Sequence, residues 1–156
     1  MKQDLHPEYH TIKIVMTDGS LPANVPSAVF RSERWDPGPA PEMRWEFPLP
    51  AGTEVEVRLF FAELYSGIET VGERVFDVRI EGLVPPDFDD IDRFAQAGAK
   101  GALMRSAIAT VQDGSLSIEL LHVAENPALN AIEIRSVEPL EPPPTNIFAS
   151  GFESPP

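Results

Sequence analysis

The chain has 156 residues, with 17 prolines, 10 glycines, no cysteine and a formal net charge of −13. This length suits one domain with its own core, and the lack of cysteine excludes disulfides and thiolate metal sites. The acidic balance argues against nucleic acid and anionic membrane surfaces as partners, because binding phosphate requires clustered Lys and Arg. No apolar run reaches the 18 residues of a membrane span, which argues against membrane insertion, and the first ten residues, MKQDLHPEYH, lack the apolar stretch of a signal peptide.

Strands are predicted along most of the chain, because apolar and polar residues alternate with a period of two and helical spacing is almost absent. In chain order the predicted strands are residues 12–16, 29–35, 43–49, 55–61, 76–80, 103–111, 116–123 and 131–137. A single helical turn is expected within residues 92–101, DRFAQAGAKG, where two glycines keep it short.

Turn residues separate these strands, and one of the turns, residues 112–114 (QDG), lies between two apolar runs and so predicts a β-hairpin. Strands at this spacing without crossover helices predict an all-β fold: antiparallel sheets packed as a β-sandwich, with a jelly roll as the leading variant. Six prolines among the last eighteen residues predict a linker or surface tail. The sandwich domain is therefore expected over residues 1–138 and the proline-rich tail over 139–156.

A glutamate interrupts the apolar face of the most hydrophobic predicted strand. In residues 55–65, VEVRLFFAELY, alternation continues the apolar face into Glu63 and Tyr65. An unpaired carboxylate in a core costs several kcal/mol, so Glu63 must be exposed at a strand end, displaced by a bulge, or paired with Arg34 or Arg74. A structural role for Glu63, at a solvated edge or in an ion pair, is favoured. In the functional alternative, Glu63 orients polar groups at a ligand-binding end of the sandwich, where Tyr65 presents its ring.

Several segments taken in order resemble one known family. They are VFRSERWD (29–36), FFAELYSG (60–67), GERVFDVRIEG (72–82), DFDDIDRFAQAG (87–98) and VQDGSLSIELLHVAENPALNAIEI (111–134). Together they resemble the malectin family of carbohydrate-binding domains. The resemblance implies a jelly-roll-like sandwich with a lectin-like sugar site made by loops at one end, no catalytic activity, and an extracellular or cell-surface location on a secreted bacterial protein.

The resemblance also assigns candidate carbohydrate-binding residues. Tyr65 matches the first of two aromatic residues that stack on sugar in the family, while Ser66 replaces the second. Glu125 stands where the family has a binding Asp, Asn126 follows it, and Trp35 occupies an aromatic position after Ser-Glu-Arg. A sugar needs a ring against its C–H face and carboxylate or amide groups for its hydroxyls, and these residues supply both types.

Glu63 completes the candidate carbohydrate-binding set, and the expected partner is an oligosaccharide or polysaccharide glycan. The further stacking tyrosines of animal malectin have no evident counterpart in this chain, so millimolar to high-micromolar binding is expected, about 4 to 6 kcal/mol. The alternative is a structural, adhesive or subunit-assembly module that has lost sugar binding, with protein partners or self-association; Ser66 favours it. Whether Trp35, Tyr65 and Glu125 gather in one concave patch discriminates between the two.

Other chemistries find less support. A glycosidase could pair Glu63 with Glu125, but 25 acidic residues make chance pairs easy. The acidic residues 87–92 (DFDDID) suggest a calcium site, although the EF-hand pattern is not met there. In the alternative, these aspartates cap turns. His122 is interpreted as a satisfied histidine at a strand end. No catalytic residue, metal or cofactor is expected.

Overall fold

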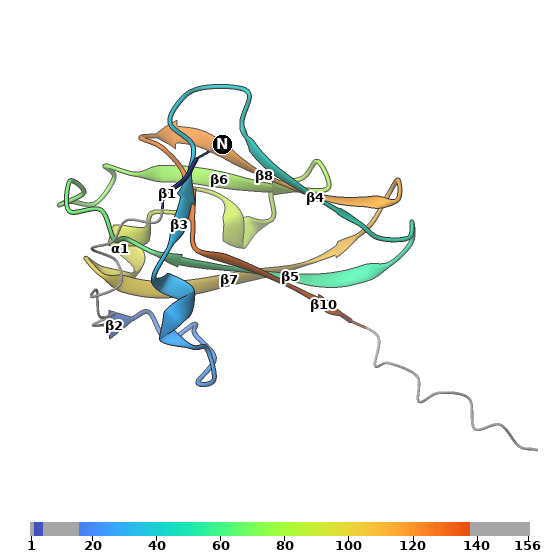
Figure 1. The fold of residues 1–156 in the computed structure, drawn as a ribbon, viewed down its shortest axis with the longest axis horizontal. Helices are drawn as coiled ribbons and strands as arrows, with labels where there is room; N and C mark the ends of the chain where they lie inside the picture. Colours follow the sequence, from blue (N-terminus) through green and yellow to red (C-terminus); the bar gives the residue numbers. More distant parts are fainter. Residues whose placement is uncertain (1, 5–15, 138–156) are drawn as a thin grey trace, which may run out of the picture.

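The computed structural model describes residues 2–4 and 16–137, and most of their regular structure is β-strand (Figure 1). The strands are β1 (Lys2–Asp4), β2 (Met16–Thr17), β3 (Glu33–Trp35), β4 (Met43–Pro48), β5 (Glu54–Ala62), β6 (Val75–Ile80), β7 (Gly101–Thr110), β8 (Ser115–Ala124), β9 (Ala128–Leu129) and β10 (Ala131–Ser136). The helices are the 3-10 turns η2 (Ser27–Phe30) and η3 (Pro86–Phe88) and the short α1 (Arg93–Ala97). The all-β class is confirmed, and so is the helical turn expected within residues 92–101. The predicted tail, 139–156, and most of the predicted strand 12–16 lie outside the described residues.

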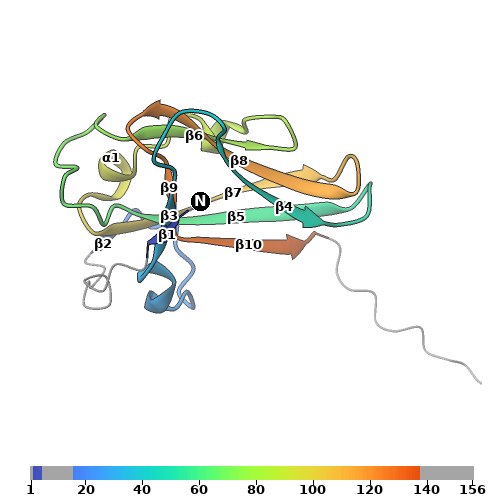
Figure 2. The ribbon, with the colours of Figure 1, turned by 45° about the horizontal axis from the view of Figure 1, so that its top comes forward.

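Two sheets face each other and form the sandwich (Figure 2). The first has the order β10-β5-β7-β2, in which only the β2–β7 pair is parallel, and the second has the order β4-β8-β6. A small third sheet, β1-β3-β9, contains strand β3, which runs across the direction of the long strands in Figure 1. Antiparallel pairing within two facing sheets confirms the predicted sandwich.

Two local predictions are wrong. The turn at residues 112–114 does not close a hairpin, because β7 pairs with β5 and β2 whereas β8 pairs with β4 and β6. Its Gly114, at a φ of 94°, reverses the chain while carrying it from one sheet to the other. The strand predicted at 29–35 is only Glu33–Trp35, since residues 27–30 form the η2 turn.

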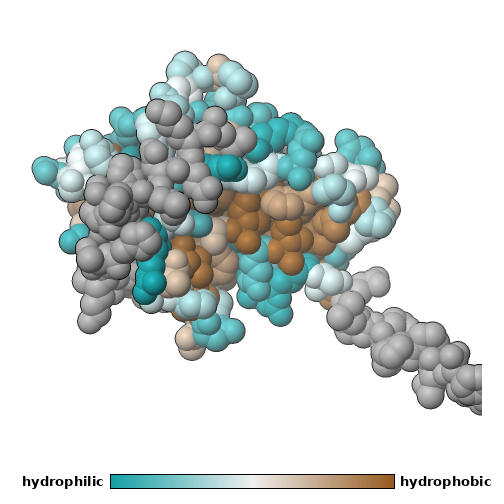
Figure 3. All heavy atoms as spheres, viewed as in Figure 1, coloured by the Kyte–Doolittle hydropathy of each residue, from teal (hydrophilic) through white to brown (hydrophobic). Residues whose placement is uncertain are grey.

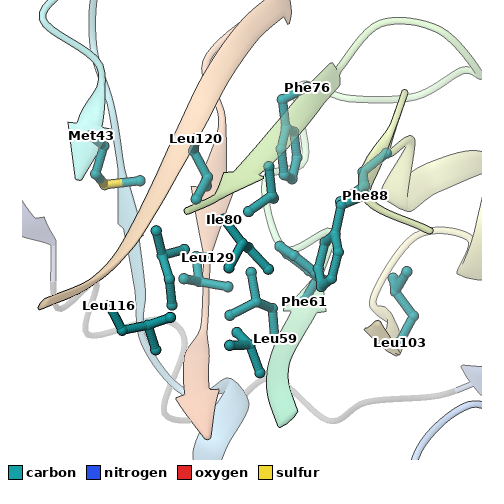
Figure 4. Close-up of a cluster of buried hydrophobic side chains, with 14 of the residues drawn as sticks. Met43, Leu59, Phe61, Phe76, Ile80, Phe88, Leu103, Leu116, Leu120 and Leu129 are labelled. Atoms are coloured by element: carbon teal, nitrogen blue, oxygen red, sulfur yellow. The ribbon is translucent and has the colours of Figure 1, made fainter. Parts of the chain in front are cut away.

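The main core lies between the two sheets, and β5 supplies one wall of it. Val57, Leu59 and Phe61 are 0% exposed, and the ring of Phe61 packs at 5.7 Å from that of Phe76 on β6 (Figure 4). Burying each such side chain stabilises the fold by about 1.5–3 kcal/mol. Phe60 and Ala62, on the opposite face of β5, belong to a second cluster below the first sheet. Strand β5 therefore loses its alternation toward its end, where both faces are covered.

The side chain of Asn130 joins three parts of the chain at the end of β5. Its Oδ1 accepts a hydrogen bond from Ala62 N at 2.7 Å, and its Nδ2 donates to the carbonyl of Ser32 at 2.9 Å. The segment before β3 and the last residue of β5 are thus fixed to the turn that begins β10.

Candidate functional site

Glu63 follows β5 directly and its side chain is only 1% exposed. Arg74 Nη1 donates to both of its carboxylate oxygens, at 2.8 and 3.1 Å. Arg93 donates to Glu63 Oε2 through Nε at 3.2 Å and through Nη2 at 2.9 Å. Both oxygens are thus occupied by guanidinium groups, which resolves the sequence question in favour of an ion pair.

A fourth residue extends this pair into a buried ion cluster, defined here as Glu33, Glu63, Arg74 and Arg93. Arg93 is 0% exposed and its Nη1 donates to Glu33 Oε2 at 3.2 Å. Two carboxylates and two guanidiniums balance in charge, and their hydrogen bonds offset the desolvation of each ion. The cluster links β3, the end of β5, the residue before β6 and α1, so it fixes one end of the sandwich.

Helix α1 presents Arg93 to this cluster because Asp92 holds the start of the helix. Asp92 Oδ1 accepts a hydrogen bond from Ala95 N at 2.9 Å, the usual arrangement of an N-cap. Its Oδ2 accepts from Gly72 N at 2.6 Å, which ties the helix to the loop that leads into Arg74. The acidic segment 87–92 therefore contributes a cap, as its alternative interpretation expected.

Tyr65 lies at the surface above the cluster. Its ring is beside the guanidinium of Arg74, with Cζ 5.8 Å from the ring centroid, and the residue is 52% exposed. Its backbone N–H donates to Glu63 Oε1 at 3.3 Å, so the cluster also positions the main chain of Tyr65. A Cβ at Gly67 would come within 2.4 Å of the Tyr65 ring, so the glycine leaves space for the ring in its observed position. An aromatic ring with a cation on one side and open surface remaining is a suitable platform for a ligand.

The pKa of Arg74 reflects both its burial and the charges around it. Burial and the neighbouring Arg93 lower the pKa of Arg74, while the carboxylates of Glu63, Glu33 and Glu125 act in the opposite direction. Arg74 stays charged, since guanidinium groups do not deprotonate in proteins. Its Nε is buried and, among the described residues, has no hydrogen-bond partner. Glu125 is exposed, and its negative charge favours the charged form of this guanidinium.

Glu125 and Asn126 belong to the turn between β8 and β9, and β3 is attached to that turn. Glu125 has a left-handed φ of 57°, and Asp36 N, just after Trp35, donates to Pro127 O at 3.1 Å. Trp35 pairs with Ala128 in the sheet, and strand alternation turns its side chain to the same side of β3 as Glu33.

The structure thus places Tyr65 against Arg74, whose pKa the charge of Glu125 also affects, and it attaches the strand of Trp35 to the turn that carries Glu125 and Asn126. The assignment of Glu63 to the carbohydrate-binding residues is corrected: at 1% exposure its side chain has no surface for direct ligand contact. Its role is to hold the arginines beneath Tyr65.

Sequence reasoning named Arg74 as one possible partner of Glu63 but missed Arg93. The other named partner, Arg34, instead lies 5.8 Å from the ring centroid of Trp45. Arg93 stands in a short helical turn, and nothing in the local pattern distinguishes it from a solvated arginine. The one available signal was Asp92, a residue type that favours N-caps, immediately before it.

The described residues also form a concave feature, which we call the side groove. It is a cavity of about 410 Å³ between β3, β4, β9 and β10. Its lining residues are Ser32, Glu33, Arg34, Trp45, Phe47, Leu129, Asn130, Ala131 and Ile132. Figure 3 shows hydrophobic side chains gathered on the face of the molecule between β4 and β10. Trp35, Tyr65 and Glu125 are not among the residues that line this groove.

Two groups of side chains among the described residues have the composition of a cation site. Asp77, Asp89 and Asp90 form an acidic group at the surface, and two of the three belong to the segment 87–92 considered for calcium. Asp36, Glu42 and His122 form the other. His122 is a satisfied histidine as expected, because its Nδ1 lies 2.5 Å from Glu42 Oε2. No helix in the described part of the chain is long and apolar enough to cross a membrane.

Together the fold and the site define a class of protein, an antiparallel β-sandwich that presents an aromatic ring and opposite charges at one end. Residues 5–136 match the model of the Malectin domain, and the chain belongs to this family.

One curated relative with a similar sequence is much longer than this chain. The chain is 31% identical over 111 residues to "Receptor-like protein 4" of Arabidopsis thaliana, a match that covers 70% of this chain and 17% of that protein. A second similarity is confined to 20 residues, 13% of this chain, which are 75% identical to large ribosomal subunit protein bL31 of Rhizobium meliloti (strain 1021), over 27% of its length. A match of that length shows no family.

Solved structures with the same fold include plant receptor domains. The ANXUR2 extracellular domain from Arabidopsis thaliana has a TM-score of 0.69 at 17% identity, over 83% of this chain and 38% of its own. A complex of the plant peptide RALF23 with FER and LLG2 contains a similar chain, with a TM-score of 0.65 at 19% identity, over 81% of this chain and 36% of that one. A Bacteroides uniformis beta-glucuronidase shares the fold at a TM-score of 0.59 and 19% identity, over 74% of this chain and 13% of its own.

Proposed function

We propose that this chain is a noncatalytic carbohydrate-binding module that binds an oligosaccharide or polysaccharide glycan. The observation that carries the proposal is the position of Tyr65, half exposed, with its ring against Arg74 at the end of the sandwich. Glu125, whose charge acts on the same guanidinium, is proposed to offer the acceptor that an oriented sugar hydroxyl requires. Trp35 and Asn126 are proposed to extend the site from the neighbouring turn.

The chemistry follows from the surface of a sugar. Its C–H face packs on the Tyr65 ring, while Glu125 accepts hydrogen bonds from hydroxyl groups. Hydrogen bonds to charged groups contribute about 1.5–3 kcal/mol each. Because the buried ion cluster fixes Arg74 and the backbone of Tyr65 beforehand, little conformational entropy is lost on binding.

The same cluster argues against glycosidase chemistry. Hydrolysis of a glycosidic bond uses two carboxyl groups, and the pair suggested by the sequence was Glu63 with Glu125. Both oxygens of Glu63 are bound to arginine and the side chain is buried, so it cannot reach a substrate as acid, base or nucleophile.

An extracellular or cell-surface location on a larger protein accords with this function. The chain spans 17% of Receptor-like protein 4 and 38% of the ANXUR2 structure, which is described as an extracellular domain. The activity of any whole protein that contains this module, and its bacterial origin, are part of the proposal.

The proposal is tested by a glycan array followed by NMR titration of the best hits, of maltose and of nigerose. Saturable shifts are expected in the wild type and are expected to vanish in Tyr65→Ala, a variant that should stay folded because Tyr65 lies at the surface. Trp45→Ala, in the side groove, is the matched aromatic control and should keep the shifts. Absence of shifts at about 10 mM sugar, where millimolar binding is visible, would overturn the proposal.

One observation favours a second function, assembly with a protein partner. The side groove is lined by Trp45, Phe47 and Ile132 and lies between β4 and β10, each of which is an edge strand within the described residues. Apolar surface beside an open strand edge is the kind of surface that protein partners cover. Self-association is the form tested first: light scattering across a concentration series should show dimers in the wild type and monomers in Phe47→Glu. Monomers of the wild type at every concentration would remove self-association from consideration.

A further inference from the structure

Asp36, Glu42 and His122 approach one another from three places in the fold. Asp36 follows β3, Glu42 precedes β4, and His122 lies near the end of β8. One carboxylate oxygen of each acid and one ring nitrogen of the histidine lie within 4.8 Å of one another, and all three residues are half-buried. The proposed sugar site uses none of these side chains.

The ring orientation of His122 determines what this group can do. Its Nε2 lies 3.3 Å from the carbonyl oxygen of Asp36, which can only accept a hydrogen bond, so this contact favours the tautomer with its hydrogen on Nε2. In that tautomer the lone pair of Nδ1 faces Glu42 Oε2, only 2.5 Å away. Two acceptors this close require a positive centre between them, either a proton or a metal ion. A backbone carbonyl that fixes the tautomer is also the usual partner of a metal-binding histidine.

The third residue is already oriented. Asp36 Oδ2 accepts a hydrogen bond from Met43 N at 2.7 Å, so its carboxylate is held beside the start of β4 while its other oxygen has coordination capacity left. Glu42 stands immediately before Met43, and the same strand start therefore positions both acids. The fold itself therefore brings three side chains together, two from the ends of the loop 36–42 and one from strand β8.

We propose that Asp36, Glu42 and His122 bind a divalent transition metal ion through His122 Nδ1 and one oxygen of each acid. One imidazole and two carboxylates with a water molecule make a four-coordinate site of the kind that suits Zn²⁺. Ligands at ~2.1 Å from a tetrahedral ion lie about 3.4 Å apart. Glu42 Oε2 and Nδ1 must therefore separate by roughly 1 Å on binding, a movement within reach of partly exposed side chains.

A metal here would anchor the loop of residues 36–42 to β8. The same loop is attached through Asp36 N to Pro127 O, and so to the turn that carries Glu125 and Asn126. The ion would consequently stabilise the part of the sandwich end that lies next to the proposed sugar site, without touching a sugar.

The experiment is a titration of the full chain with ZnCl₂ at about pH 7.5, where carboxylates and a neutral imidazole are free to coordinate, in competition with a chromophoric chelator. One Zn²⁺ per chain is expected, with a Kd of ~10 µM or tighter. His122→Gln and Glu42→Gln should each weaken binding by at least ~10-fold. Long-range ¹H–¹⁵N NMR of the histidine rings should show the Nδ1 signal of His122 shifting on zinc addition while Nε2 keeps its hydrogen.

Two controls make the assignment specific. The chain has two other histidines, His6 and His10, so the double variant His6→Gln/His10→Gln should bind zinc with unchanged affinity. Asp90→Asn, in the other acidic group, should also leave binding unchanged. The proposal is overturned if the wild type binds no zinc below ~100 µM, if His122→Gln binds as well as the wild type, or if the His6/His10 variant loses binding. Because Glu42 lies at the end of a loop, Glu42→Gln tests the same site if His122→Gln folds poorly, and unchanged zinc affinity in that variant would equally overturn the proposal.

Discussion

Replacing Glu63 by Gln should be among the most damaging single changes that conserve side-chain size in this protein. The wild-type carboxylate accepts four hydrogen bonds from two guanidinium groups, and the side chain is 1% exposed. Gln has nearly the same shape but no charge, and its NH₂ group would face arginine donors. Removing one partner from a buried ion pair leaves an uncompensated charge and costs about 3–5 kcal/mol. For a domain of this size that corresponds to a fall in Tm of about 6–20 °C.

Urea unfolding followed by tryptophan fluorescence measures this loss. The matched control is Glu46→Gln, which breaks the 2.8 Å bridge between Arg44 and Glu46 where both side chains are about half exposed. The control should change the free energy of unfolding by less than about 1 kcal/mol. A loss below ~1 kcal/mol for Glu63→Gln as well would refute the reasoning, since a buried network of this kind would then contribute no more than a surface pair.

Two further changes test other parts of the fold. Asn130→Ala should lower the free energy of unfolding by about 2–4 kcal/mol, because it leaves the buried Ala62 N–H without its acceptor; an unchanged urea midpoint would contradict this. For Asp18, burial raises the pKa, but hydrogen bonds from Ser20 and the nearby Arg105 outweigh it and hold the pKa below its ordinary value of 3.8. A lowered carboxylate pKa stabilises the fold above the unfolded pKa and this stabilisation is lost as the pH falls through the folded pKa, so the advantage of wild type over Asp18→Asn should close below about pH 4. A stability difference that persists unchanged to about pH 2 would show that Asp18 acts through something other than its charge.

The long strands were predictable because each exposes one polar face. In β4 the residues Met43, Trp45 and Phe47 alternate with exposed ones, and the burial observed follows that alternation. Where a strand is covered on both faces the signal weakens, as at the end of β5. The hairpin prediction at residues 112–114 failed for a different reason. Asp113-Gly114 specifies a reversal of the chain, but the same backbone conformation serves a turn within one sheet and a turn between two sheets.

The candidate site was predictable only in part. Tyr65 and Glu125 stay predictions from the family resemblance, whereas the charge of Glu63 showed that a partner had to exist. The choice of Arg93 depends on α1 packing against the end of β5, a contact between residues 30 positions apart that no local pattern encodes. Arg34 was an equal candidate by sequence, and only the direction of β3, which turns Glu33 inward and Arg34 toward Trp45, decides against it.

The order of strands in the second sheet has a consequence for how the protein is made. Strand β8 is the middle strand of β4-β8-β6, yet it is synthesised after both of its neighbours. Until residues 115–124 have left the ribosome, β4 and β6 have no strand between them to pair with, and their apolar faces have no completed core to cover. Folding that depends on such distant pairings is slow, and its intermediates expose strand edges. A nascent chain that stalls at residue 114 therefore presents two unpaired strands, and chaperone binding should peak there and fall once β8 has emerged.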